Sequence, residues 1–150
     1  MALDPALVGK TYPPSEPYEV GREKIREFAE AIGDANPAYR DVELAKQLGY
    51  ADVIAPPTFP IVLTLKASGV AAFDPEVGID YSRVVHGDQR FVYSRPVRAG
   101  DRLICTVSIE SARSIAGGDI LGTKAEVSTE DGEHVVTAYS TIVSRSKGDD

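Results

Sequence analysis

The first half of the chain carries apolar residues at helical spacing. Between positions 21 and 32 they fall at i, i+3, i+4 and i+7, which is one face of a helix: Ile25, Phe28, Ala29 and Ile32. Gly33 offers a C-terminal cap, and Pro37 prevents continuation of the helix. A second, shorter helix is predicted over residues 41–48, with Gly49 at its end.

A third helix is predicted to begin near Thr58, after two prolines. Apolar residues cover most of its circumference, which is typical of a helix in the centre of a fold; they include Ile61, Val62, Leu65 and Val70. Residues 12–17 contain Pro13, Pro14 and Pro17 and are predicted to be an extended lead-in. Residues 147–150 are predicted to be a disordered tail.

The second half of the chain is patterned as β-strands. We predict four strands, over residues 90–97, 102–111, 119–129 and 133–145. Apolar residues alternate along the second of these, at Leu103, Cys105, Val107 and Ile109. The sequence Glu-Asp-Gly at 130–132 predicts a hairpin between the last two strands.

Helices followed by antiparallel strands predict an α+β domain, with a long sheet around or beside one apolar helix. A chain of 150 residues buries enough surface to fold as one such domain without disulfides or metal. No Gly-x-Gly-x-x-Gly motif follows a strand, which argues against a dinucleotide-binding domain.

Composition narrows the classes of function. The formal net charge of −7 opposes general nucleic-acid binding, which needs an excess of basic residues. The longest uncharged run, residues 53–65, contains three prolines and cannot form a spanning helix, and no secretory signal is visible at the N-terminus. A single cysteine suits a reducing compartment. We therefore expect a cytoplasmic protein with neither nucleic acid nor membrane as a partner.

Isolated residues that could bind metal or act as nucleophiles are few. His86 and His134 are the two histidines, and together with the distant Cys105 they do not form a metal-ligand pattern, so no metal is expected. Cys105 alternates with Leu103 and Val107 and is predicted to be a core residue. His134 lies beside a turn and is predicted to be solvated.

Several segments are collinear with those of a known family. Residues 31–39, Ala-Ile-Gly-Asp-Ala-Asn-Pro-Ala-Tyr, resemble the G-D-x-N-P-x-H signature of MaoC-like (R)-specific enoyl hydratases and 3-hydroxyacyl dehydratases. Residues 53–59 resemble the segment that leads into their central helix, and residues 86–91 and 95–101 resemble later strand motifs of the fungal-synthase-like dehydratase N-terminal domain. The resemblance implies one hot-dog domain over residues 1–150, in which a bent antiparallel sheet wraps around a long central helix.

The family's chemistry gives each motif position a role. In these enzymes an Asp and a His five positions apart act as the acid/base pair that removes water from a (3R)-3-hydroxyacyl thioester, and an Asn supports them. A helix N-terminus donates backbone N–H groups to the thioester oxygen. The resemblance places Asp34 and Asn36 in these roles and puts Tyr39 where the family has His.

Two departures from the family pattern predict a degenerate site. Tyrosine, with a pKa near 10, is a poor base at neutral pH, whereas histidine titrates near the working range. The segment that leads into the central helix also lacks three possible backbone donors, because proline has no N–H; these are Pro56, Pro57 and Pro60.

The sequence therefore predicts a substrate-holding, non-catalytic subunit of a two-subunit (3R)-hydroxyacyl-thioester dehydratase of fatty-acid metabolism. Its partners would be an acyl thioester, carried by acyl carrier protein or CoA, and a catalytic hot-dog homologue as a heterodimer, or a second copy in isolation. No cofactor is expected, because the reaction is redox-neutral. The residues predicted to contact substrate are Pro57, Thr58, Phe59 and Val62, although core packing explains this apolar face equally well.

Other interpretations stay open at this point. The chain could be an autonomous homodimeric hydratase in which Asp34 works with His86 or Tyr39, although the sequence favours His86 as a strand-edge histidine bonded to neighbouring backbone. It could also be a non-enzymatic acyl-thioester-binding or scaffold protein, or a hot-dog thioesterase. Six arginines between positions 83 and 113 would suit an acidic carrier protein, but solvent-facing strand positions account for them too.

Overall fold

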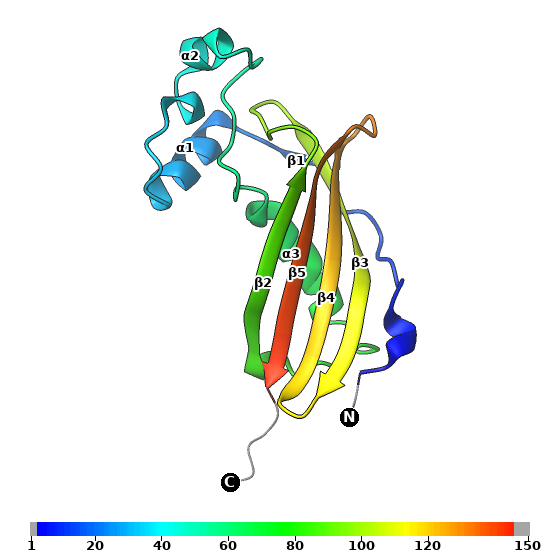
Figure 1. Cartoon of the computed structure of the whole chain (residues 1–150). Helices are drawn as coiled ribbons and strands as arrows, with labels where there is room; N and C mark the ends of the chain where they lie inside the picture. The colour runs from blue at the N-terminus through cyan, green and yellow to red at the C-terminus, as the bar shows by residue number, and fades with distance from the viewer. Residues whose placement is uncertain (1–2, 146–150) are drawn as a thin grey trace.

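The computed structural model describes residues 3–145 of the chain, so the predicted tail at 147–150 lies outside the described residues. Five strands form one antiparallel sheet in the order β1-β3-β4-β5-β2, which curls along its length (Figure 1). The strands are β1 (Tyr18–Glu19), β2 (Val84–Tyr93), β3 (Arg102–Ile115), β4 (Gly118–Thr129) and β5 (His134–Arg145).

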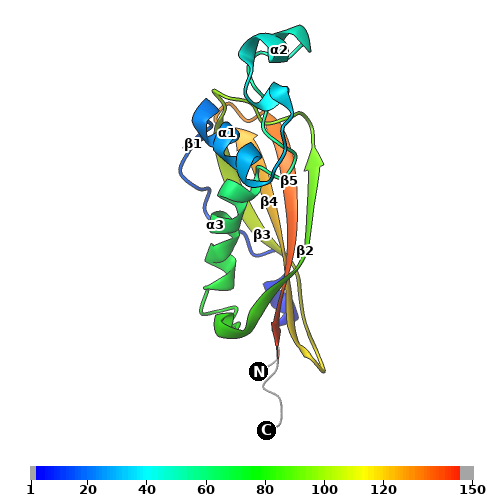
Figure 2. The ribbon, with the colours of Figure 1, turned by 90° about the vertical axis from the view of Figure 1, so that its left-hand side faces the viewer.

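In the described part of the chain, three α-helices accompany the sheet. They are α1 (Arg22–Ala31), α2 (Val42–Gln47) and α3 (Ile61–Ala72), and the 3₁₀ turns are η1 (Pro5–Leu7), η2 (Pro37–Tyr39) and η3 (Tyr81–Arg83). Helix α3 lies lengthwise along one face of the sheet, whereas α1 and α2 gather at one end of it (Figures 1 and 2). The predicted α+β architecture is confirmed.

The core lies between α3 and the sheet, mainly under β3 and β4. The predicted alternation along β3 is confirmed, because Leu103, Cys105, Val107 and Ile109 are all buried. Burial raises the pKa of the Cys105 thiol to about 12, so this side chain is a packed core residue as predicted. Helix α3 is less central than predicted, because Leu65 and Val70 are exposed.

Several element boundaries differ from the prediction. Strand β2 begins at Val84 instead of residue 90, because the polar stretch 86–89 hid its first half. It ends at Tyr93, before Pro96, which lacks the N–H that a continued ladder would need. Strand β3 continues to Ile115, and α3 begins only at Ile61, after a turn that contains Pro60.

A bulge in β2 decides which of its side chains face α3. The register against β5 shifts between His86 and Asp88, so Gly87 is the extra residue. Val84 and His86 line a cavity against α3 before the shift, and Gln89 lines another after it. Without the bulge, strict alternation would place residues 86 and 89 on opposite faces of the sheet.

The β3–β4 hairpin depends on one glycine. Gly118 has φ +143°, and a Cβ atom there would overlap the carbonyl oxygen of Ser144 on β5. The hairpin can therefore close against β5 only with glycine at this position.

Within residues 3–145, no helix is long and apolar enough to cross a membrane.

Candidate functional site

The loop after α1 holds the two polar residues of the signature. Gly33, with φ +72°, ends the helix, and the Asp34 carboxylate then accepts a hydrogen bond from the Asn36 backbone N–H at 3.1 Å. The Asn36 side chain in turn caps η2 by accepting from the Ala38 backbone N–H at 3.0 Å. Both side chains therefore support the local turn, and together they bring Tyr39 next to Asp34.

Tyr39 occupies the centre of this site. Its side chain is buried and interacts with the Asp34 carboxylate. Burial raises the pKa of Tyr39, and the negative charge of Asp34 and a hydrogen bond to it raise the pKa further. The phenol is therefore protonated at neutral pH and can donate a hydrogen bond but cannot accept a proton from a substrate carbon.

Tyr39 forms part of the wall of a cavity of about 340 Å³. The cavity lies between the segment before α3 and the end of β2, and its lining is Tyr39, Ile54, Ala55, Pro57, Tyr93, Ser94, Arg95 and Pro96. The Tyr93 hydroxyl donates to the Pro57 carbonyl oxygen at 2.6 Å. Burial and the neighbouring Tyr39 raise the pKa of Tyr93. We refer to this space as the Tyr39 cavity.

The segment that leads into α3 presents few backbone donors. Pro56, Pro57 and Pro60 have no N–H. The Phe59 N–H donates to the Pro56 carbonyl oxygen at 2.9 Å, and the next two amides bond within the same turn, to the carbonyl oxygens of residues 58 and 59. These amides are consequently unavailable to a thioester oxygen.

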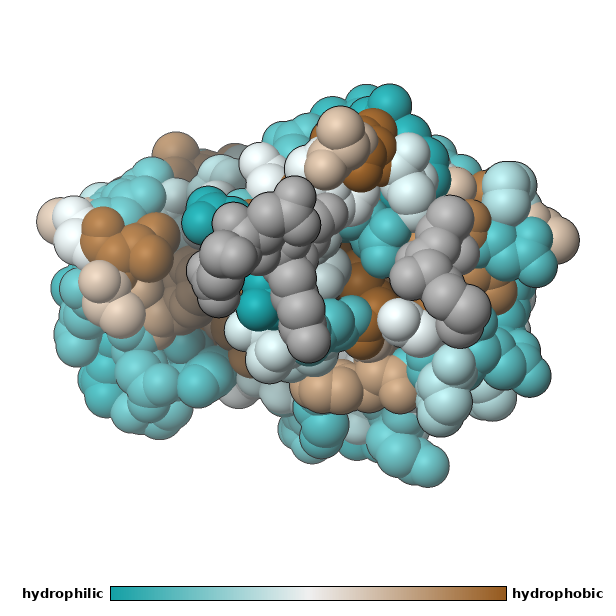
Figure 3. All heavy atoms as spheres, turned by 90° about the horizontal axis from the view of Figure 1, so that it is seen from below, coloured by the Kyte–Doolittle hydropathy of each residue, from teal (hydrophilic) through white to brown (hydrophobic). Residues whose placement is uncertain are grey.

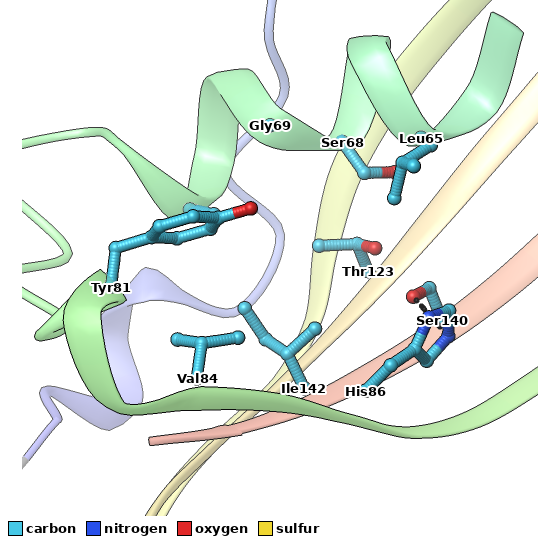
Figure 4. Close-up of a pocket in the computed structure, with 10 residues that line it drawn as sticks. Leu65, Ser68, Gly69, Tyr81, Val84, His86, Thr123, Ser140 and Ile142 are labelled. Atoms are coloured by element: carbon cyan, nitrogen blue, oxygen red, sulfur yellow. Dashed lines mark hydrogen bonds between the residues drawn. The ribbon is translucent and has the colours of Figure 1, made fainter.

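His86 lies in a different part of the molecule. It lines a cavity between α3 and the sheet, with its ring beside Ser140 (Figure 4). Its Nε2 atom donates to the Asp88 carbonyl oxygen at 3.0 Å, as predicted for a strand-edge histidine. Tyr93 is seven positions further along β2, which corresponds to about 20 Å of strand. The structure therefore does not bring His86 to Asp34 within one chain.

The residues predicted to contact substrate have different surroundings. Pro57 lines the Tyr39 cavity, and Thr58 is exposed beside it. Phe59 is fully buried and packs edge to face on Phe28, with ring centroids 5.5 Å apart. Val62 packs against the core. Phe59 is thus a core residue and not a cavity wall, because its ring has no surface left for a ligand.

Sequence reasoning missed one pair that the structure forms. Ser94 lines the Tyr39 cavity, and its Oγ lies 2.5 Å from Nδ1 of His134, whose Nε2 lies 2.7 Å from Oγ1 of Thr137. His134 is therefore hydrogen-bonded on both ring nitrogens and only partly exposed, and its prediction as a solvated residue is wrong. The partners meet because β2 pairs with β5, a contact that no local pattern indicates.

Most of the six arginines between positions 83 and 113 form ion pairs with acidic residues of the same chain. Arg95 lines the Tyr39 cavity, yet its guanidinium binds both oxygens of the buried Asp101, at 2.8 and 2.9 Å, and also Glu133. Arg102 pairs with Glu130 at 2.9 Å, and Arg90 stacks over the ring of Tyr139. These contacts favour a structural role for the arginines. They argue less for a surface that binds an acidic carrier protein. Within residues 3–145, no cluster of His, Cys, Asp and Glu is arranged to hold a metal ion.

A curled antiparallel sheet with a helix along one face, and the degenerate signature at one end, define a MaoC-like hot-dog domain. The comparisons support this class: over residues 6–138 the chain matches the family described as FAS1-like, dehydratase domain region. The chain belongs to that family.

Its relatives include a UPF0336 protein of Streptomyces coelicolor, 66% identical over 145 residues, which are 97% of each chain. Among solved structures, a MaoC-like dehydratase superposes with a TM-score of 0.86 at 35% identity, over 94% of this chain. The chain spans only 43% of that protein's length. The C-terminally truncated HadBC (3R-hydroxyacyl-ACP dehydratase) complex of Mycobacterium tuberculosis superposes with a TM-score of 0.78 at 38% identity, over 91% of this chain and 96% of the other.

Proposed function

We propose that this chain is the non-catalytic subunit of a (3R)-3-hydroxyacyl-thioester dehydratase, or (R)-specific enoyl hydratase, of fatty-acid metabolism. It holds the acyl thioester, and a homologous hot-dog subunit supplies the catalytic Asp and His. The observation that carries the proposal is the burial of Tyr39 against Asp34, at the position where the family has its histidine.

The acid/base chemistry of the family has no substitute base here. Removal of a weakly acidic Cα proton needs a base that titrates near neutral pH, and the raised pKa of Tyr39 excludes the phenol. Both imidazoles are hydrogen-bonded elsewhere, His86 to Asp88 and His134 to Ser94 and Thr137. Asp34 itself accepts from a backbone amide and interacts with Tyr39, so it lacks a partner for proton transfer.

The site also offers few hydrogen-bond donors for the carbonyl oxygen of a thioester. A thioester oxygen that gains negative charge needs fixed donors, and the segment before α3 offers few: three positions are prolines, and the amides of Phe59, Ile61 and Val62 are donated to backbone carbonyls, which leaves the N–H of Thr58. Loss of one such donor typically costs about 10²–10³-fold in rate. Two independent losses at one site favour a holding role over an altered catalytic mechanism.

Several features support a hot-dog partner. β2 is at one edge of the sheet, so the outer edge of this ten-residue strand has no partner strand within residues 3–145. HadBC, a relative in structure, is a complex of two chains by its name. The longer MaoC-like dehydratase has room for a second domain of similar length beside the part that matches. We propose that the partner pairs with the free edge of β2 and lies over the exposed flank of α3.

The test measures hydration of crotonyl-CoA by the purified chain alone and after mixing with a homologue that carries the intact G-D-x-N-P-x-H signature. We expect no turnover by the chain alone. The mixture should be active, and Asp34→Ala in this chain should leave that activity unchanged. A homologue whose own signature Asp and His are replaced by Ala serves as the control and should give an inactive mixture.

Activity of the chain alone that disappears in Asp34→Ala would instead favour the autonomous homodimeric hydratase. Saturable binding of long-chain acyl-CoA, without activity in any mixture, would favour the acyl-thioester-binding or scaffold protein.

A further inference from the structure

Ser94 and His134 form a hydrogen-bonded pair at the wall of the Tyr39 cavity. Ser94 is exposed and lines the cavity, and its Oγ lies 2.5 Å from Nδ1 of His134. The other ring nitrogen, Nε2, lies 2.7 Å from Oγ1 of the buried Thr137. A nucleophile, a base within hydrogen-bond reach and a third group that orients the base are the parts of a serine nucleophile site. The dehydration chemistry uses none of these three side chains.

Two features of the backbone hold the pair in place. Ser94 directly follows β2, and its N–H donates to the Val135 carbonyl oxygen at 2.8 Å, so the serine is fixed to β5. Near the start of β5 the register against β4 shifts, which makes Val135 an extra residue. Strict alternation would put residues 134 and 137 on opposite faces of the sheet, whereas this bulge lets His134 and Thr137 meet.

The surroundings of His134 suit a base that gains and returns a proton. An imidazolium has two N–H groups, and here each has an oxygen to bond, Ser94 Oγ at Nδ1 and Thr137 Oγ1 at Nε2. A hydroxyl stabilises the imidazolium less than the carboxylate of a complete triad does, so we expect a slow catalyst.

A second serine–histidine pair, between α3 and the sheet, lacks this property. The Oγ of Ser140 lies 3.4 Å from Nε2 of His86. That nitrogen donates to the Asp88 carbonyl oxygen, so it carries a proton and cannot accept another from the serine. Ser140 therefore provides a matched control for Ser94 within the same chain.

The Tyr39 cavity limits the substrate to a short acyl group. Its volume of about 340 Å³ is near the lower end of the range for small-ligand sites, roughly 300–1,000 Å³. Ile54, Ala55 and Pro96 supply apolar wall for the acyl group. In the described segment before α3, the N–H of Thr58 is the amide that is left for the carbonyl oxygen, and a single donor again favours slow turnover.

We propose that Ser94 is a nucleophile that cleaves short acyl thioesters in the Tyr39 cavity, with His134 as its base and Thr137 as the residue that positions the imidazole. The inference rests on the proposed holding of an acyl thioester, and it adds a reaction separate from dehydration, in which this chain stays non-catalytic.

The reaction has two steps. Ser94 Oγ attacks the thioester carbonyl carbon while its proton passes to Nδ1 of His134; the C–S bond then breaks, and the leaving thiolate takes that proton. Water next attacks the acyl-serine ester with the help of the same base. This second step releases the carboxylic acid and restores the Ser94 hydroxyl.

The experiment measures the release of free CoA from butyryl-CoA by the purified full chain, with a thiol reagent. Ser94→Ala and His134→Ala should each lower the rate by about tenfold or more, and added imidazole should restore activity to His134→Ala but not to Ser94→Ala. Thr137→Val should lower kcat about threefold without a change in KM, and Thr137→Ser should keep the wild-type kcat. Ser140→Ala is the control and should hydrolyse butyryl-CoA at the wild-type rate.

A fluorophosphonate probe, which reacts with activated serines, gives a readout that does not need the thioester. Mass spectrometry should locate the probe on Ser94 and leave Ser140 unlabelled. Hydrolysis that survives Ser94→Ala, failure of imidazole to restore His134→Ala, or absence of labelling at Ser94 would overturn the inference.

The proposed dehydratase role is decided separately, by hydration of crotonyl-CoA in the mixture with the catalytic homologue. An active mixture together with no hydrolysis of butyryl-CoA by the wild-type chain would overturn the inference and leave the proposed function intact. An inactive mixture and no hydrolysis would overturn both.

Discussion

The hydroxyl of Tyr93 donates a 2.6 Å hydrogen bond to the carbonyl oxygen of Pro57, and so joins the end of β2 to the segment before α3. Both residues line the Tyr39 cavity. Because Pro57 cannot use an N–H of its own, its carbonyl is the backbone group through which β2 holds this segment in place. The shape of the Tyr39 cavity therefore depends on this contact.

Tyr93→Phe should lower the free energy of unfolding by about 1 kcal/mol, because it removes one hydrogen bond and leaves the Pro57 carbonyl oxygen unpaired. Urea denaturation followed by circular dichroism measures the change. Tyr81→Phe is the matched control, since Tyr81 is 48% exposed, and its effect should stay within about 0.5 kcal/mol. Equal effects of the two substitutions would show that the Tyr93 contact adds no stability.

Tyr39→His tests whether the missing base alone accounts for the inactivity that we propose for this chain. An imidazole beside Asp34 restores an acid/base contribution of about 10²–10⁴-fold, but the segment before α3 still offers few backbone donors for the thioester oxygen. We therefore expect crotonyl-CoA hydration that is measurable yet at least about 10²-fold below that of a homologue with the intact signature. Tyr39→Phe is the control and should be inactive.

Full activity of Tyr39→His would mean that the donors before α3 are dispensable. It would also remove the second of the two arguments for a non-catalytic subunit.

The N-terminal segment is held by an acid-sensitive contact. The Asp74 carboxylate accepts from Lys10 Nζ and from the Tyr12 hydroxyl, each at 2.7 Å. The Lys10 hydrogen bond, followed by that of Tyr12, lowers the pKa of Asp74 to about 2. A carboxyl whose pKa is lower in the folded state adds stability above its unfolded value near 4, and this stability is lost as the pH falls toward 2.

Asp74→Asn should therefore flatten the decline of the urea midpoint between about pH 4 and pH 2 relative to the wild-type chain. At pH 7 the variant should be less stable than wild type, because the charge-assisted contacts are weakened. Asp131→Asn, in the β4–β5 turn, is the control and should keep the wild-type pH profile. An unchanged slope in Asp74→Asn would assign the acid sensitivity to other carboxyls.

Periodicity predicted the elements whose two faces differ most. β3 alternates Leu103, Cys105, Val107 and Ile109 because one face meets α3 and the other does not. The first half of β2 escaped prediction because its inward residues, His86 and Gln89, are polar and a bulge at Gly87 shifts their spacing. The cavity between α3 and the sheet, which His86 lines, could not be predicted for the same reason.

Resemblance to the family located the site better than any local pattern did. Asp34, Asn36 and Tyr39 form one turn, and their role depends on motif order rather than on composition. The resemblance over residues 53–59 could not separate Phe59, which is in the core, from Pro57, which lines the cavity, because both are apolar. Ser94 and His134 meet only through the pairing of β2 with β5, which depends on tertiary structure.

The proposed partner should cover an apolar surface at the end of α3. Seen from below, the molecule shows hydrophobic residues among hydrophilic ones (Figure 3). Phe73, directly after α3, is 63% exposed, and its ring lies 4.2 Å from that of Tyr81. Exposed aromatic residues beside an unpaired strand edge are typical of a surface that a partner protein covers.

Phe73→Asp should therefore weaken association with the catalytic homologue at least tenfold, because a desolvated charge would replace an apolar contact. Analytical ultracentrifugation of the mixed proteins measures the dissociation constant, and the melting temperature of the variant alone should change little since Phe73 is largely exposed. Leu48→Asp, which alters an equally exposed apolar residue at the end of α2, is the control and should leave association unchanged. Weakening by both substitutions to the same extent would place the partner elsewhere than on the flank of α3.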